Sequence, residues 1–199
     1  MRRSACPAGA ASHTAAAPAR DKPERQRGRY QRTAAGFRLR VATVADLDAC
    51  CRLFDAPWSR ECFFGSKQST EYVREWLASG LQTPGPTDRC WVACTRRQPR
   101  TIGFCAVWGG LLCYAVDPAY RGRGLASQLV MAICNALCAA GLYKNVDAVA
   151  FEDNAASHAV LLKCGFEFQR RSLVRIQGKT VPVPLLHFAR PPLPPVPSG

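Results

Sequence analysis

The residues best suited to chemistry lie in one stretch, from Tyr114 to Ala126, which reads YAVDPAYRGRGLA. An apolar run passes through Pro118 into a turn that holds Gly122 and Gly124, and a helical pattern follows directly. The start of a helix presents unpaired N–H groups and a positive dipole end, and glycines let a phosphate approach these groups closely. The stretch therefore predicts a phosphate cradle. The alternative is a plain strand-to-helix turn that carries two exposed arginines.

The elements that must position this cradle alternate between strand and helix. Apolar residues spaced four, three, four and three apart predict a helix from Gly124 to about Ala140, with Gly141 as its C-terminal glycine. Strands are predicted over 37–42, 89–95, 102–108, 111–116, 146–151, 166–176 and 183–188, and further helices from 43, over about 70–78 and over 154–163. The strand–helix–strand unit over 111–151 requires a parallel pair. We expect an α/β (α+β) fold with a mixed, mostly antiparallel central sheet of about seven strands flanked by about four helices.

Length and composition indicate one globular domain with tails. The chain has 199 residues, of which 48% are hydrophobic and 21% charged, and no apolar run approaches the roughly 20 residues that cross a bilayer. Residues 1–35 are rich in Ala, Arg and Pro, and residues 191–199 read PPLPPVPSG. We expect both ends to be disordered, which leaves 36–190 as the domain. An organelle transit peptide is the alternative for the leader.

Charge and cysteine usage narrow the classes of partner. The net charge is +13, but residues 1–40 hold ten basic and two acidic residues and so contribute +8 of it. The remaining +5 suits an anionic ligand as well as a nucleic acid. The eleven cysteines are an odd number, form no CxxC pair and lie mostly in apolar runs, with only three histidines in the chain. We expect free thiols in a reducing cytoplasm and no bound metal.

Two motifs give the chain a family resemblance. RGRGLA over 121–126 resembles the [RQ]-x-x-G-x-[GA] signature of the GNAT superfamily of N-acetyltransferases, and VDPAY over 116–120 precedes it as in many members. The second family motif stands as FEDNAASHAVLLKCGF over 151–166. Together with FRLR over 37–40, this wording is most similar to the RimJ/RimL branch. The resemblance covers residues 36 to about 190.

The resemblance implies transfer of an acetyl group from acetyl-CoA to a primary amine by direct attack, without an acyl-enzyme. The pyrophosphate would lie on the amides of 121–126, and the pantetheine would run along 114–116 with its amide contacted by Asn154. A backbone N–H near Ala115 or Val116 would polarise the thioester carbonyl. The implied cofactor-binding residues are Tyr114, Ala115, Val116, Arg121, Gly122, Arg123, Gly124, Leu125, Ala126 and Asn154.

Residues for proton transfer are less clearly marked. Many family members carry a tyrosine acid seven residues after the motif asparagine, where this chain has Leu161. Ser157 is the substitute acid, or else it bonds the backbone at the third position of its helix. Glu152 is the predicted base, or else a carboxylate exposed near a helix start. Cys113 and Cys164 have no His or Asp partner at a suggestive position, so a cysteine nucleophile is not predicted.

The acceptor is left open between a protein N-terminus and a small-molecule amine, with the chain acting as a monomer or a homodimer and without a membrane. Trp58, Phe63 and Phe64 fall in the loop that walls the acceptor site in the family, and they either shape the pocket or are ordinary core or surface aromatics. Two other classes of function remain. One is an acyl-CoA-binding module without turnover, and the other is a basic nucleic-acid-binding protein.

Overall fold

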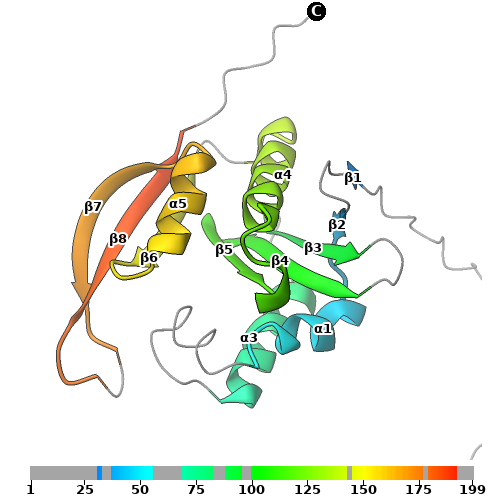
Figure 1. Cartoon of the computed structure of the whole chain (residues 1–199), viewed down its shortest axis with the longest axis horizontal. Coiled ribbons are helices and arrows are strands. Elements are labelled where there is room, and N and C mark those ends of the chain that lie inside the picture. The colour runs from blue at the N-terminus through cyan, green and yellow to red at the C-terminus, as the bar shows by residue number, and fades with distance from the viewer. Residues whose placement is uncertain are drawn as a thin grey trace, which may run out of the picture.

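One sheet organises the part of the chain that the computed structural model describes, which is residues 31–32, 37–55, 69–82, 88–95, 100–142, 145–176 and 179–191. Eight strands lie in the order β1-β2-β3-β4-β5-β6-β8-β7 (Figure 1). They are β1 (Gln31–Arg32), β2 (Phe37–Val41), β3 (Arg89–Thr95), β4 (Thr101–Trp108), β5 (Leu111–Val116), β6 (Val146–Phe151), β7 (Glu167–Val174) and β8 (Val183–Arg190). The α-helices are α1 (Leu47–Arg52), α3 (Thr70–Gln82), α4 (Leu125–Ala139) and α5 (Ala155–Lys163), with 3-10 helices η1 (Val44–Asp46) and η2 (Pro118–Tyr120).

This architecture confirms the predicted mixed, mostly antiparallel fold. Among the strand pairs of the described residues, β5 and β6 are parallel and the others are antiparallel. Apart from the two-residue β1, seven strands and four α-helices are present in the described ranges. Strand β1 comes from the stretch expected to be a leader, and it pairs with β2. Residues 1–30, 33–35 and 192–199, which hold the rest of the expected tails, lie outside the described residues.

Two helical layers cover the sheet, one on each face (Figure 1). On one face α4 and α5 pack over the larger apolar core, in which Leu129, Ile133 and Leu137 of α4 are almost completely buried. On the other face α1 and α3 cover a second core that includes Phe54 and Leu77. No helix of the described ranges combines the length and the apolar composition needed to span a bilayer.

Helix α3 continues beyond the predicted end near residue 78 and reaches Gln82. Gly80 lies inside it, although glycine disfavours a helix interior by about 1 kcal/mol relative to alanine. A Cβ atom at Gly80 would lie only 2.3 Å from Cζ2 of Trp108. The glycine therefore makes room for the Trp108 indole against the helix, a long-range reason that the local pattern does not contain.

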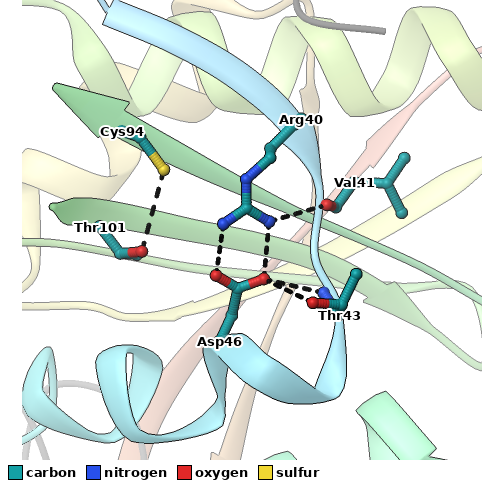
Figure 2. A network of polar contacts seen from close by, with 6 residues as sticks. All are labelled: Arg40, Val41, Thr43, Asp46, Cys94 and Thr101. Carbon is teal, nitrogen blue, oxygen red and sulfur yellow. Dashed lines mark hydrogen bonds and ion pairs between the residues drawn. The ribbon is translucent and has the colours of Figure 1, made fainter. Parts of the chain in front are cut away.

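A partly buried ion pair joins β2 to the start of α1 (Figure 2). The Arg40 guanidinium donates from Nη1 to Oδ2 of Asp46 over 2.6 Å and from Nη2 to Oδ1 over 2.5 Å. Asp46 also accepts from the backbone N–H of Thr43 at 2.9 Å, which forms a capping box at the start of the helix predicted from residue 43. Burial alone would raise the pKa of the Asp46 carboxyl, but Arg40 and Thr43 together hold it below its ordinary value.

The sheet is open along the line between β5 and β6. These strands pair only at Leu111 with Asp147 and at Leu112 with Ala148. Beyond those pairs, residues 113–116 remain bonded to β4 and residues 149–151 to β8, and the two strands diverge (Figure 1). We call the unpaired interval between residues 113–116 and 149–151 the seam.

Candidate active site

A cavity of about 690 Å³ lies along the seam. Every residue of β5 from Leu111 to Val116 lines it. Because successive residues of a strand point to opposite faces of the sheet, the cavity follows the edge of β5 and opens on both faces. It therefore has two parts, one on the side of α4 and α5 and one on the side of α3.

The first part, called here the polar compartment, is built around the start of α4. Gly124 is the N-cap residue of α4 and has a left-handed backbone with φ 74°. Gly122 has φ 71°, and a Cβ atom placed there would meet nothing within 4 Å. At Gly124 the nearest atom to such a Cβ is Nε2 of Gln128 at 3.8 Å. The helix start is thus left open to an approaching group, and its first N–H groups have no partner within the helix.

Arginine side chains flank this cradle in two different ways. The Nε of Arg121 donates to the Val116 carbonyl at 3.1 Å, which ties the turn to the end of β5, and Arg121 lines the cavity. The Arg123 guanidinium lies 5.5 Å from the ring centre of Tyr120 and is not part of the cavity wall. The structure brings the predicted cofactor-binding residues to the cavity, with Arg123 as the exception. Those that line it are Tyr114, Ala115, Val116, Arg121, Gly122, Gly124, Leu125, Ala126 and Asn154.

Two hydroxyl groups meet inside the polar compartment. The Tyr114 phenol and the Ser157 Oγ are 2.6 Å apart, and either can be the donor. Asn154 is the N-cap of α5, and its Oδ1 accepts from the Ser157 N–H at 3.1 Å. The Ser157 hydroxyl is thus directed to another side chain in the cavity. Burial raises the pKa of Tyr114 well above its ordinary value, so the phenol keeps its proton.

The sequence indicated only a main-chain role for Tyr114, and its side chain was missed. The signal was present in the alternation of β5, because Leu112, Tyr114 and Val116 share the face that α5 also covers. The alternation cannot predict that Tyr114 meets Ser157, because Ser157 lies 43 positions later in the chain.

Glu152 lies outside the cavity wall. Its carboxylate forms a two-bond pair with Arg171 of β7, with Nε to Oε1 at 2.7 Å and Nη2 to Oε2 at 3.0 Å. Both side chains are about half exposed. The hydrogen bond from Arg171 lowers the pKa of the Glu152 carboxyl, which makes it a weaker base than a free glutamate. The structure therefore places Glu152 beside Arg171 and outside the lining of the cavity.

The cysteines near the site are held as neutral thiols. Cys113 lines the cavity, and its Sγ donates to the Ala106 carbonyl at 3.6 Å. The Cys164 Sγ bonds the Ser127 carbonyl at 3.6 Å. Burial raises the pKa of both thiols, which disfavours a nucleophilic thiolate. Within the described ranges nine cysteines are free, and no three His, Cys, Asp or Glu side chains gather as metal ligands.

The second part of the cavity, called here the aromatic compartment, lies on the α3 side of the sheet. It is lined by Phe54, Tyr72, Trp76, Trp108, Leu111, Cys113 and Val149. Tyr72 and Trp76 come from α3, Trp108 ends β4, and Phe54 follows α1. Trp58, Phe63 and Phe64, which the sequence suggested for this wall, lie outside the described residues.

Comparison with known proteins defines the class of enzyme. The sequence profile of the acetyltransferase (GNAT) domain matches residues 37–167. The chain belongs to this family and is an acyltransferase. A search of curated proteins finds no match to it.

Solved structures share the fold at low sequence identity. A ribosomal-protein-S5-alanine acetyltransferase from Vibrio fischeri is 14% identical, with a TM-score of 0.68 over 82% of this chain and 96% of that one. A spermidine N-acetyltransferase from Vibrio cholerae, in complex with CoA and spermine, is 13% identical, with a TM-score of 0.66 over 79% and 96%. A phosphinothricin acetyltransferase from Sinorhizobium meliloti, in complex with acetyl-CoA, is 18% identical, with a TM-score of 0.61 over 78% and 88%.

Proposed function

We propose that the chain transfers the acetyl group of acetyl-CoA to a primary amine by direct attack in a ternary complex. One observation carries the proposal: an open helix start with two left-handed glycines lies at one end of a cavity that continues through the seam to the other face of the sheet. This arrangement offers a phosphate site and an acceptor site that meet along one strand edge. Two substrates can therefore reach each other from opposite sides of the sheet.

The residues present fit acetyl-CoA in the polar compartment. The pyrophosphate suits the N–H groups at the start of α4, because Gly122 and Gly124 leave space there and the helix dipole favours negative charge. Arg121 adds a positive side chain at the cavity wall. The pantetheine suits the seam, since the main chain of residues 113–116 is unpaired toward β6. Asn154 lies on the same wall.

The reaction joins the amine nitrogen to the thioester carbonyl carbon while the carbon–sulfur bond breaks. A backbone N–H near Ala115 or Val116 would stabilise the negative charge on the carbonyl oxygen. The departing sulfur takes a proton from the Ser157 and Tyr114 hydroxyl pair, which lies in the same compartment. The amine gives its proton to water, because no carboxylate or imidazole lines the cavity among the residues that the structure describes.

Further features belong to the same proposal. The RimJ/RimL branch is supported by the FEDNAAS wording and by the fold shared with ribosomal-protein-alanine acetyltransferases. A cytoplasmic location is supported by the free thiols of the described cysteines. Residues 36–190 form the catalytic domain, which acts on its amine acceptor as a monomer or a homodimer.

A pair of glycine variants tests the cradle. Gly124→Leu and Gly141→Leu each place a side chain in a left-handed position at one end of α4, so the two carry a similar backbone cost of about 1–2 kcal/mol. Only Gly124→Leu should weaken CoA binding, by about ten- to a hundredfold in calorimetric titration, because hydrogen bonds to a charged group are lost. Unchanged affinity in a folded Gly124→Leu variant, or equal losses in both, contradicts the cradle.

Turnover is tested separately on the unaltered chain. Release of the CoA thiol, followed across protein N-terminal peptides, polyamines and other primary amines, should occur only when donor and acceptor are both present. Binding of acetyl-CoA without release for any amine would instead identify an acyl-CoA-binding module. Ping-pong kinetics, or an acetylated cysteine trapped on the protein, would contradict direct attack.

A further inference from the structure

The aromatic compartment has a wall of stacked rings. Trp76 and Trp108 meet edge to face, with ring centres 4.7 Å apart and an angle of 76° between the ring planes, and the ring centre of Phe54 lies 6.2 Å from that of Trp76 in a similar geometry. Phe104 is fully buried, and its ring centre lies 5.7 Å from that of Trp108. Tyr72, one turn before Trp76 on α3, lines the cavity and is 46% exposed. Aromatic rings prefer such edge-to-face arrangements, so the rings stabilise one another's positions in the wall.

Gly80 holds this wall in its place. Because the Gly80 Cα faces the Trp108 indole without an intervening side chain, Trp108 lies against α3 and leaves the compartment open. Any larger residue at this position would move the indole. The shape of the aromatic compartment thus depends on a helix position where glycine is otherwise unfavourable.

Charge is distributed unevenly between the two compartments. Among the described residues that line the cavity, Arg121 alone is charged, and it lies in the polar compartment. The aromatic compartment therefore presents rings and aliphatic groups but no described carboxylate. Each ammonium group that packs against these rings loses hydration, which adds a cost for every positive charge on the acceptor. A single amino group on an apolar body fits well.

Resting on the proposed function, we infer that the acceptor is an arylalkylamine: one primary amine joined by a short alkyl chain to an aromatic ring. The ring packs on Tyr72, Trp76 and Trp108, where edge-to-face contacts match the geometry of the wall. The short chain places the nitrogen at the seam beside Cys113, where the thioester of the bound donor lies in the proposed reaction.

The same surroundings account for the loss of the amine proton. Transfer of an ammonium group from water to an apolar wall favours its neutral form. The neutral amine is the nucleophile, so the compartment itself favours the reactive species. An arylalkylamine uses this effect fully, since its only charge is the one that it must lose.

A substrate comparison tests the inference directly. With saturating acetyl-CoA, kcat/KM for 2-phenylethylamine should exceed that for spermidine and for an alanine-led tripeptide amide by about tenfold or more, a ratio typical of a matched apolar pocket. A higher kcat/KM for spermidine or the peptide leaves acetyl transfer intact and overturns the arylalkylamine. Failure of every amine to release thiol contradicts the proposed function itself.

Side-chain variants locate the effect in the aromatic compartment. Tyr72→Ala should lower kcat/KM for 2-phenylethylamine by about tenfold while the CoA dissociation constant stays unchanged. Phe168→Ala is the matched control, because Phe168 is a 54% exposed aromatic residue on β7 away from the cavity. Gly80→Ala should raise the KM for 2-phenylethylamine without altering CoA affinity. Equal effects of Tyr72→Ala and Phe168→Ala, or unchanged kcat/KM in a folded Tyr72→Ala variant, contradict the assignment.

Discussion

The polar and aromatic compartments share one cavity but are made from different parts of the chain. The polar compartment is mostly main chain: helix-start N–H groups, two left-handed glycines and the free edge of β5. The aromatic compartment is made of side chains from α3, β4, β5, β6 and the segment that follows α1. A main-chain site needs particular backbone angles and therefore a short local motif. A side-chain site can change its ligand by single substitutions while the motif stays the same.

The largest expected effect tests whether the polar compartment also depends on side chains. Removing either hydroxyl, in Ser157→Ala or Tyr114→Phe, should lower kcat by about a hundredfold, since the departing thiolate loses its proton donor. The double variant should be little worse than either single variant, because both hydroxyls belong to one pair. CoA affinity should not change.

Ser172→Ala is the control for the hydroxyl pair. The Ser172 hydroxyl also bonds a side chain, His187 Nε2 at 2.7 Å, but neither residue lines the cavity. Full additivity in the double variant would show that Ser157 and Tyr114 do not act together. Normal turnover in both single variants would remove the hydroxyl pair from the mechanism.

A second test asks whether destabilising the start of α1 affects the aromatic compartment and leaves the polar compartment unchanged. Asp46→Asn breaks the partly buried pair that anchors the start of α1 and leaves the Arg40 charge without its carboxylate, so we expect a loss of about 2 kcal/mol in the free energy of unfolding, measured in urea. The KM for the acceptor should rise because Phe54 follows this helix, whereas CoA affinity should not change. Asp48→Asn, whose pair with Arg74 is exposed, should have little effect.

The Asp46 pair also predicts how the stability of the protein changes with pH. Because the folded-state pKa of Asp46 lies below its value in the unfolded chain, its stabilisation is complete above the unfolded pKa and is lost as pH falls through the folded pKa. The gap in stability between the native chain and Asp46→Asn should therefore shrink below about pH 4. A gap that persists in acid would show that packing, and not charge, stabilises this contact.

A third test addresses the source of the nucleophile. If water accepts the amine proton, log kcat/KM should rise by about one for each pH unit below the pKa of the amine, measured from pH 6 to 9. The raised pKa of Tyr114 keeps the hydroxyl pair protonated across this interval, so no descending limb should appear. A plateau that begins near neutral pH would reveal a base supplied by the protein.

The smallest expected effect concerns Glu152. Glu152→Gln should change turnover by no more than about threefold, because the carboxylate is paired with Arg171 at the surface and does not line the cavity. If Glu152 were the base that deprotonates the amine, the same substitution would lower turnover by about a hundredfold. Arg171→Gln should behave in the same way.

The main-chain features of the site could be predicted from the sequence, whereas the contacts between its side chains could not. The cradle could be predicted because Gly122, Gly124 and the helical pattern after them are neighbours in the chain, and the helix over 154–163 could be predicted for the same reason. Strand and helix order followed from periodicity, and the structure confirms it. These features depend on interactions over a few residues.

The aromatic compartment could not be predicted because its members meet only after folding. Phe54 and Trp108 are more than fifty positions apart, yet they belong to one ring cluster with Trp76 between them. The pairing of Tyr114 with Ser157 and the early predicted end of α3 have the same origin. In each case a contact between distant segments decides what the local pattern leaves open.

The seam has a consequence for how the molecule responds to its donor. The strands β1 to β5 and the strands β6, β8 and β7 are joined in the sheet by only two residue pairs of β5 and β6. A pantetheine arm that pairs along 113–116 would act as an added strand and bridge the two halves. Binding would then stabilise the whole fold by linkage and slow hydrogen exchange most strongly in the amides bordering the seam. The co-substrate would thus complete the architecture of the enzyme as well as supply its acetyl group.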